Sequence, residues 1–192
     1  MIRALIAALA LTAACASAPK PRGPVDPLAG VDAAELYRIG LAEARGGDTL
    51  RAEQYLAAAL VRGYDDAMIP LLRICVTGER YGAALRYAQN RLAARPGDWQ
   101  LRYLTAELLG AVGRFDDERA QLETLVSEVS DRPEPHFALA QAYEREGFAR
   151  RAATHYARYL ALAPTGRYAR EARHRKAELR RQRHRHHHRR KQ

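Results

Sequence analysis

The sequence predicts an all-α fold, a solenoid of antiparallel helix pairs that ends in a C-terminal capping helix. From about Asp32 onward, apolar residues recur three and four positions apart, which is the spacing of one face of an α-helix. Short loops with Gly or Pro interrupt this pattern periodically. Pro96 and Pro164 are 68 residues apart, and Tyr81 and Phe115 are 34 residues apart. A helical pattern with this period indicates stacked helix pairs, because a single pair cannot bury its own apolar face.

Residues 1–15 have the organisation of a signal peptide. Arg3 precedes an almost unbroken apolar run of 11 residues, Ala4–Ala14, which is shorter than the roughly 20 residues of a membrane-spanning helix. The segment Leu11-Thr12-Ala13-Ala14-Cys15 resembles the lipobox of bacterial lipoproteins, which implies that the Cys15 thiol carries a diacylglycerol. The alternative is ordinary cleavage at Ala16-Ser17-Ala18, which would release a soluble exported chain.

Residues 16–32 are predicted to be a Pro-rich linker. Its prolines are closely spaced, at Pro19, Pro21, Pro24 and Pro27. This density favours an extended polyproline II chain, which has no internal hydrogen bonds. The segment is either a spacer that holds the domain away from a membrane or a disordered leader.

Three full repeats are predicted at residues 65–98, 99–132 and 133–166. The last has apolar, small and aromatic residues at regular places in two helices, namely Leu139, Ala140, Tyr143, Gly147, Ala152, Tyr156 and Pro164. This pattern resembles the tetratricopeptide-repeat signature, with Leu, a small residue and Tyr in the first helix, a small residue early in the second helix, and a closing Pro. Small residues are needed where two helix axes approach closely.

The other repeats depart from this pattern at a few places. In residues 65–98, Cys75 falls where Tyr143 falls in the last repeat. In residues 99–132, Glu118 stands where a small residue is expected, so this repeat is degenerate. Residues 33–64 form an earlier, weaker unit. Its small residues are Gly40, Ala52 and Ala59.

The C-terminal part is predicted to close the array. Residues 167–181 read as a capping helix with a narrow apolar stripe, because the end of a repeat array needs a polar outer face. Residues 182–192 form a basic tail rich in His and Arg. From residue 167 to 192 there are twelve Lys or Arg against Glu171 and Glu178, so this part carries the whole net charge of +10.

The basic residues suggest attachment to a polyanion. The candidate contacts are Arg180, Arg181, Arg183, Arg185, Arg189, Arg190 and Lys191. For an exported chain we expect an anionic membrane or cell-wall polymer as the partner. Nucleic acid is not expected there, and the alternative is a solvated tail without a partner. A metal site at the His cluster of residues 184–188 is not expected either, because the surrounding arginines repel a dication.

The family resemblance implies where a partner would bind. In tetratricopeptide-repeat proteins the first helices line a concave groove, and the second, fifth, ninth, twelfth and thirteenth places of each repeat face the ligand. Transferred to this sequence, the partner-binding residues are Tyr37, Leu41, Arg45, Ile69, Arg73, Tyr103, Glu107, Phe137, Gln141 and Arg145. Such a row of apolar, aromatic and polar side chains suits a docked protein or peptide. Packing between repeats is the alternative role for the aromatic residues.

No catalytic constellation is recognisable. His136 and His155 occupy different helices, and no cysteine has metal-ligand spacing to either. Cys75 falls at a core position, and Ser occurs only at residues 17, 127 and 130, which leaves no room for a serine triad. We therefore expect no enzymatic activity, no cofactor and no metal.

Together these features predict a lipid-anchored interaction scaffold in the outer membrane or periplasm of a Gram-negative bacterium. The whole resembles the envelope tetratricopeptide lipoproteins that assist assembly of outer-membrane, pilus or secretion complexes. The alternative function is a polyanion or nucleic-acid binder that acts through the basic tail.

Overall fold

The computed structural model describes the backbone of residues 28–189 and the side chains of residues 28–182. The chain divides into two units, Met1–Val31 and Asp32–Gln192. The first contributes only a short turn to the described residues, and the second holds all the helices described below. No strand occurs in the described part of the chain, so the predicted all-α class is confirmed.

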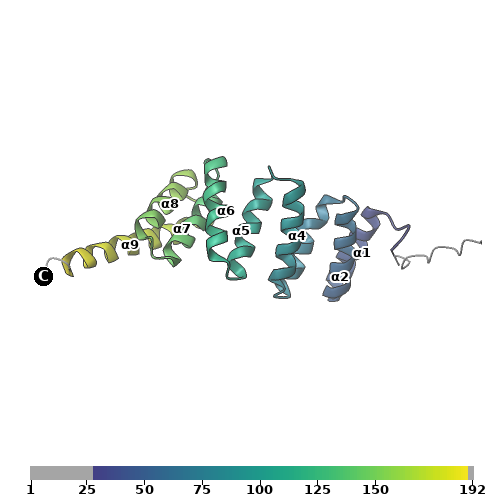
Figure 1. Ribbon diagram of the computed structural model, residues 1–192. Coiled ribbons are helices and arrows are strands. Elements are labelled where there is room, and N and C mark those ends of the chain that lie inside the picture. The colour runs from purple at the N-terminus through teal and green to yellow at the C-terminus, as the bar shows by residue number, and fades with distance from the viewer. Residues whose placement is uncertain (1–27, 190–192) are drawn as a thin grey trace, which may run out of the picture. The chain divides into compact units, whose positions relative to one another are not determined.

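Four helix pairs follow one another in the second unit. They are α1 (Ala33–Gly46) with α2 (Thr49–Val61), α3 (Met68–Thr77) with α4 (Tyr81–Ala94), α5 (Trp99–Ala111) with α6 (Phe115–Glu128), and α7 (Pro133–Arg145) with α8 (Ala149–Leu162). A short 3₁₀ turn, η1 (Asp65–Ala67), precedes α3, and α9 (Ala169–Arg189) follows α8. Each helix packs against the next, and Figure 1 shows their succession from purple to yellow. The predicted solenoid of helix pairs is therefore present.

Aspartates fix the start of three helices. The side chains of Asp32, Asp48 and Asp98 accept hydrogen bonds from backbone N–H groups three residues later, at 2.7, 2.9 and 3.0 Å. Such caps satisfy donors that have no partner within the first helical turn. α7 begins instead with Pro133, whose fixed φ suits the first position of a helix.

The turn between the two helices of a repeat needs a left-handed residue. Gly113 and Gly147 supply it, with φ of 79° and 81°. The corresponding residue in residues 65–98 is Glu79, with φ of 57°. Since a side chain makes this conformation unfavourable, the turn between α3 and α4 is strained where the later turns are not.

Small residues lie where helices approach most closely. Ala52, Ala59 and Ala152 are completely buried. A Cβ atom at Gly40 would lie only 2.7 Å from Cγ of Leu56, so α1 and α2 pack at a distance that glycine alone allows. The small residues of residues 33–64 therefore have the packing role that the sequence predicts.

Glu118 is buried at the close contact between α5 and α6. It is 8% exposed, and a Cβ atom at Gly110 would lie 2.7 Å from its carboxyl carbon. Arg145 of α7 forms an ion pair with this carboxylate. Burial raises the pKa of Glu118, and Arg145 opposes that rise. The degenerate repeat thus accommodates an acid through a glycine on one side and an arginine from the next repeat.

The last repeat has an aromatic core that α9 covers. The Phe137 ring lies 5.6 Å from that of Tyr156, 5.3 Å from that of Tyr159 and 4.5 Å from that of Tyr168, measured between centroids. Phe137 is only 4% exposed. The expectation that it faces a ligand is therefore wrong in this structure, because Tyr168 stacks on its ring.

The capping helix is longer than predicted. α9 continues past the expected end at residue 181 to Arg189. Among the described side chains of α9, Ala169, Ala172 and Leu179 are buried and hold the helix against the last helix pair. Arg180 and Arg181 are exposed, whereas the side chains of Arg183, Arg185, Arg189, Arg190 and Lys191 lie outside the described residues.

Candidate partner-binding face

We call the surface made by the outward side chains of α1, α3, α5 and α7 the first-helix face. A pocket of about 370 Å³ opens on it between α3 and α5, and we call it the α3–α5 pocket. Its lining residues are Ile69, Leu72, Arg73, Val76, Tyr81, Leu104, Glu107, Leu108 and Ala111. It brings together three of the predicted partner-binding residues, namely Ile69, Arg73 and Glu107.

The walls of the α3–α5 pocket are mostly apolar. Ile69 is 57% and Val76 38% exposed, which makes them two of the large hydrophobic side chains open to solvent. Leu72 and Leu108 are buried beneath them. Clustered exposed apolar side chains of this kind mark an interaction surface more often than isolated ones do.

Two opposite charges lie on the two walls of the pocket. Arg73 is exposed on α3, and no ion pair or hydrogen bond of its side chain occurs within the described residues. Glu107 lies on α5 and accepts a hydrogen bond from the Tyr103 hydroxyl at 2.7 Å. Burial raises the pKa of Tyr103 well above its ordinary value, and the nearby Glu107 charge adds a smaller rise. Tyr103 therefore stays a neutral donor that holds the Glu107 carboxylate in place.

The predicted residues of α1 lie outside this pocket. The Tyr37 ring packs 4.8 Å from that of Tyr64, Leu41 is half-buried, and Arg45 is exposed. Nε of Arg45 donates a hydrogen bond to the Leu41 carbonyl at 3.2 Å. Tyr37 therefore contributes mainly to packing, and Arg45 remains at the surface.

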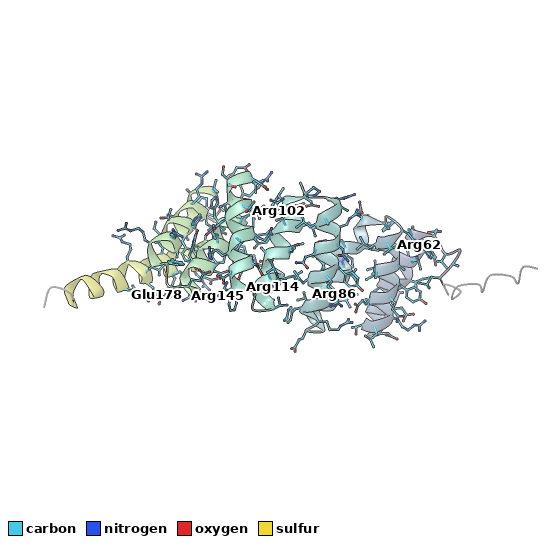
Figure 2. All side chains as sticks on the ribbon, in the orientation of Figure 1. Arg62, Arg86, Arg102, Arg114, Arg145 and Glu178 are labelled. Atoms are coloured by element: carbon cyan, nitrogen blue, oxygen red, sulfur yellow. The ribbon has the colours of Figure 1, made fainter. Side chains whose placement is uncertain are left out.

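Two of the three predicted residues of α7 line a second, smaller pocket. It has a volume of about 230 Å³ and contains Gln141 and Arg145 together with Glu144, Tyr156 and Arg175. Arg175 of α9 lies 3.5 Å from the Glu144 carboxylate. Arg145, labelled in Figure 2, pairs with Glu118 and stands 4.2 Å above the Phe115 ring. Both cations therefore already have partners, and an added anion would have to compete with carboxylates.

Several lining residues of the α3–α5 pocket were not among the predicted ones. Val76 and Ala111 occupy the twelfth and thirteenth places of their repeats, so the places implied by the resemblance could have identified them. Leu104 and Leu108 occupy places that the pattern assigns to packing, and only the geometry shows that they reach this surface.

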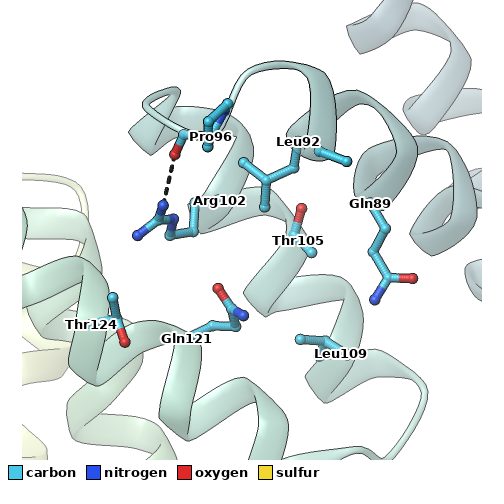
Figure 3. Close-up of a pocket in the computed structure, with 9 residues that line it drawn as sticks. Gln89, Leu92, Pro96, Arg102, Thr105, Leu109, Gln121 and Thr124 are labelled. Carbon is cyan, nitrogen blue, oxygen red and sulfur yellow. Dashed lines mark hydrogen bonds between the residues drawn. The ribbon is translucent and has the colours of Figure 1, made fainter.

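A further pocket, of about 450 Å³, lies on the other side of α5, between α4 and α6 (Figure 3). Its only charged lining residue is Arg102, which donates to the Pro96 carbonyl at 2.7 Å and pairs with Glu128 at 2.6 Å. Gln89 of α4 also lines it and is exposed. This pocket is less apolar than the α3–α5 pocket, and its charged group is already neutralised.

His136 and His155, distant in sequence, are in contact. Their Nδ1 atoms are 3.1 Å apart, and Nε2 of His136 lies 3.2 Å from the Ser130 carbonyl. Burial lowers the pKa of His136, and burial together with His136 lowers that of His155 to about 4. The pair is therefore neutral at pH 7, and one imidazole donates to the other.

The His136–His155 pair should make the last repeat less stable at acidic pH. The unfolded chain binds protons at these histidines near pH 6.5, and the folded chain binds one at His155 only near pH 4. The free energy of unfolding should therefore fall by about 1–2 kcal/mol between about pH 7.5 and about pH 5. Urea denaturation at the two pH values measures this. His155→Phe, which does not titrate, should reduce the difference, and an undiminished difference in that variant would assign the effect to other groups.

The described residues contain no group of three or more His, Cys, Asp or Glu side chains that could hold a metal ion. Cys75 is buried, and burial raises its pKa to about 11, which keeps the thiol protonated and unreactive. None of the described helices is both long and apolar enough to cross a membrane. Cys15, the predicted lipidation site, lies outside the described residues.

Comparison with known proteins places the fold. No protein family and no curated protein matches the sequence. A tetratricopeptide repeat protein from Parabacteroides merdae ATCC 43184 superposes with a TM-score of 0.66 and 18% identity, covering 77% of this chain and 60% of that one. MamA from Desulfovibrio magneticus RS-1 gives 0.60 and 17%, covering 77% and 93%. YrrB, described as a TPR protein with an unusual peptide-binding site, gives 0.61 and 18%, covering 73% and 74%.

Proposed function

From the premise that this chain has the tetratricopeptide-repeat fold, we propose that it is a non-catalytic scaffold that binds a protein or peptide partner on its first-helix face. The observation that carries the proposal is the α3–α5 pocket, an apolar opening that contains Ile69, Arg73 and Glu107. YrrB, which has the same fold, is described by its peptide-binding site. Since fold alone does not determine function, the pocket is what supports partner binding by this chain.

Site-specific photo-crosslinking tests this proposal. A photoreactive amino acid at position 69 should give a covalent adduct with a discrete partner in producing cells, because Ile69 is exposed at the edge of the pocket. The same amino acid at position 89 is the matched control, since Gln89 is exposed beside the pocket on the other side of α5. Adducts at position 89 and none at position 69 would place the partner elsewhere.

The cellular location belongs to the same proposal. A lipid on Cys15 would hold the scaffold at the outer membrane of a Gram-negative bacterium, where it would assist assembly of an outer-membrane, pilus or secretion complex. The lipobox resemblance supports this anchor, and the Pro-rich residues 16–32 would act as a spacer.

A second contact, through the basic C-terminal residues, is supported by the charge distribution. Residues 167–192 carry the whole net charge of +10, and Arg180 and Arg181 are exposed on α9. Each basic group near an anionic surface contributes about 1 kcal/mol. We therefore include an anionic membrane or cell-wall polymer among the partners and regard nucleic acid as the alternative polyanion.

Two measurements separate the two membrane contacts. Cys15→Ser should abolish incorporation of labelled palmitate, whereas deletion of residues 182–192 should leave it unchanged. The purified deletion variant should lose most of its binding to anionic vesicles at low salt. Binding by the undeleted chain should fade at about 0.5 M salt, because the Debye length then falls well below 10 Å. Palmitate incorporation in Cys15→Ser would refute the anchor, and vesicle binding that survives both deletion and salt would refute the tail contact.

A further inference from the structure

The α3–α5 pocket constrains the backbone of whatever occupies it. Apart from Arg73, Glu107 and the Tyr81 hydroxyl, its lining side chains are apolar, and the backbone groups of α3 and α5 are bonded within their helices. An extended peptide pressed into this pocket would bury main-chain N–H and C=O groups without partners, which is costly. A helix satisfies its own main-chain groups and presents only side chains. The pocket chemistry therefore favours a helical occupant.

The spacing of the wall residues leads to the same conclusion. Ile69, Arg73 and Val76 follow one another at the i, i+4, i+7 spacing along α3. On α5, Leu104, Glu107, Leu108 and Ala111 lie at the i, i+3, i+4, i+7 spacing. Each wall is thus a helical ridge with a charge between apolar residues, and a third helix can lay its own ridge between two such ridges.

The charges on the two walls indicate which charged side chains a bound helix should carry on either side of its apolar residues. Arg73 and Glu107 stand on opposite walls, and no ion pair joins them among the described residues. Arg73 has no carboxylate partner among the described residues, and Glu107 accepts a hydrogen bond from the Tyr103 hydroxyl but has no cationic partner there. An acidic side chain would complement Arg73, and a basic one would complement Glu107.

We infer that the α3–α5 pocket binds an amphipathic helix of a partner protein whose apolar anchor is flanked by one acidic and one basic side chain. This inference rests on the proposed function and adds the conformation and charge pattern of the ligand. The volume of about 370 Å³ lies near the lower end of the range of ligand-binding clefts, roughly 300–1,000 Å³.

Three synthetic helical peptides of about four turns test the inference. All three share one apolar face and differ only at two flanking positions. The first peptide carries Glu at both positions, the second carries one Glu and one Lys (the mixed peptide), and the third carries Lys at both. Wild-type protein should bind the mixed peptide about three to ten times more tightly than the other two, measured by fluorescence anisotropy. Arg73→Glu should shift the preference to the peptide with two Lys, and Glu107→Lys should shift it to the peptide with two Glu.

One further variant serves as a matched control. Arg86→Glu reverses an exposed charge on α4 outside the pocket and should leave the ranking unchanged. Because Arg73 and Glu107 are exposed, their variants should melt as the wild type does.

The outcomes distinguish this inference from the proposed function. The same ranking in every variant, or no binding of any peptide to wild-type protein, overturns the inference. Tighter binding of a Pro-interrupted, non-helical peptide with the same side chains also overturns it. A partner crosslinked at position 69 would still support the scaffold function in each of these cases.

Discussion

Replacing Tyr156 by Ala is expected to lower the free energy of unfolding by about 3–5 kcal/mol. The side chain is completely buried in α8, and its ring packs edge-on against Phe137 at 5.6 Å. Its hydroxyl donates to Glu144 at 2.8 Å, so the substitution both opens a cavity and removes a hydrogen bond. Urea denaturation followed by circular dichroism measures the loss.

Tyr156→Phe separates the two contributions. It keeps the ring and removes only the hydroxyl, and Glu144 retains Arg175 at 3.5 Å. The expected loss is about 0.5–1.5 kcal/mol, the usual net value of one hydrogen bond. If Tyr156→Phe were as destabilising as Tyr156→Ala, the hydrogen bond rather than the packing of the ring would dominate at this position.

Ending the chain at Gly166 is expected to have a comparably large effect. The truncation removes α9 and with it the buried side chains Ala169, Ala172 and Leu179. It also removes the Tyr168 ring, which stacks on Phe137 at 4.5 Å. The free energy of unfolding should fall by at least about 3 kcal/mol, and the uncovered Phe137 should promote self-association, measurable by light scattering.

The matched control ends the chain at Arg181. This variant lacks residues 182–192 but keeps Leu179, the last buried residue of α9 among the described side chains. Its stability should stay within about 0.5 kcal/mol of the full chain, as for most surface changes. Equal melting temperatures for the chains ending at Gly166 and at Arg181 would show that α9 does not stabilise the array.

The fold could be predicted because the same packing requirement recurs in successive repeats. Close approach of two helices demands a small residue, and Ala52, Ala84 and Ala152 satisfy that demand at the same place of three repeats. Glu118 breaks the pattern, and the sequence revealed the break. The compensation by Gly110 and Arg145 was not apparent, because it depends on contacts between helices.

The candidate site was only partly predictable. Places transferred from the family identified Ile69, Arg73 and Glu107, which do share a pocket. They failed for Phe137 because the helix that follows the last repeat differs from a repeat helix and places Tyr168 over that ring. The contact between His136 and His155 was also missed, because no short motif marks two residues that meet only when α7 and α8 pair.

The packing of Gly110, Glu118 and Arg145 has a consequence for how this chain can diverge. A side chain at position 110 would displace the Glu118 carboxylate from its place beside Arg145, and loss of Arg145 would leave a buried acid without its counter-charge. Replacing Glu118 by Ala would remove both constraints at once. Among descendants and relatives of this sequence, the three positions should therefore tend to change together, with Gly110 and Arg145 free to vary where position 118 is not acidic.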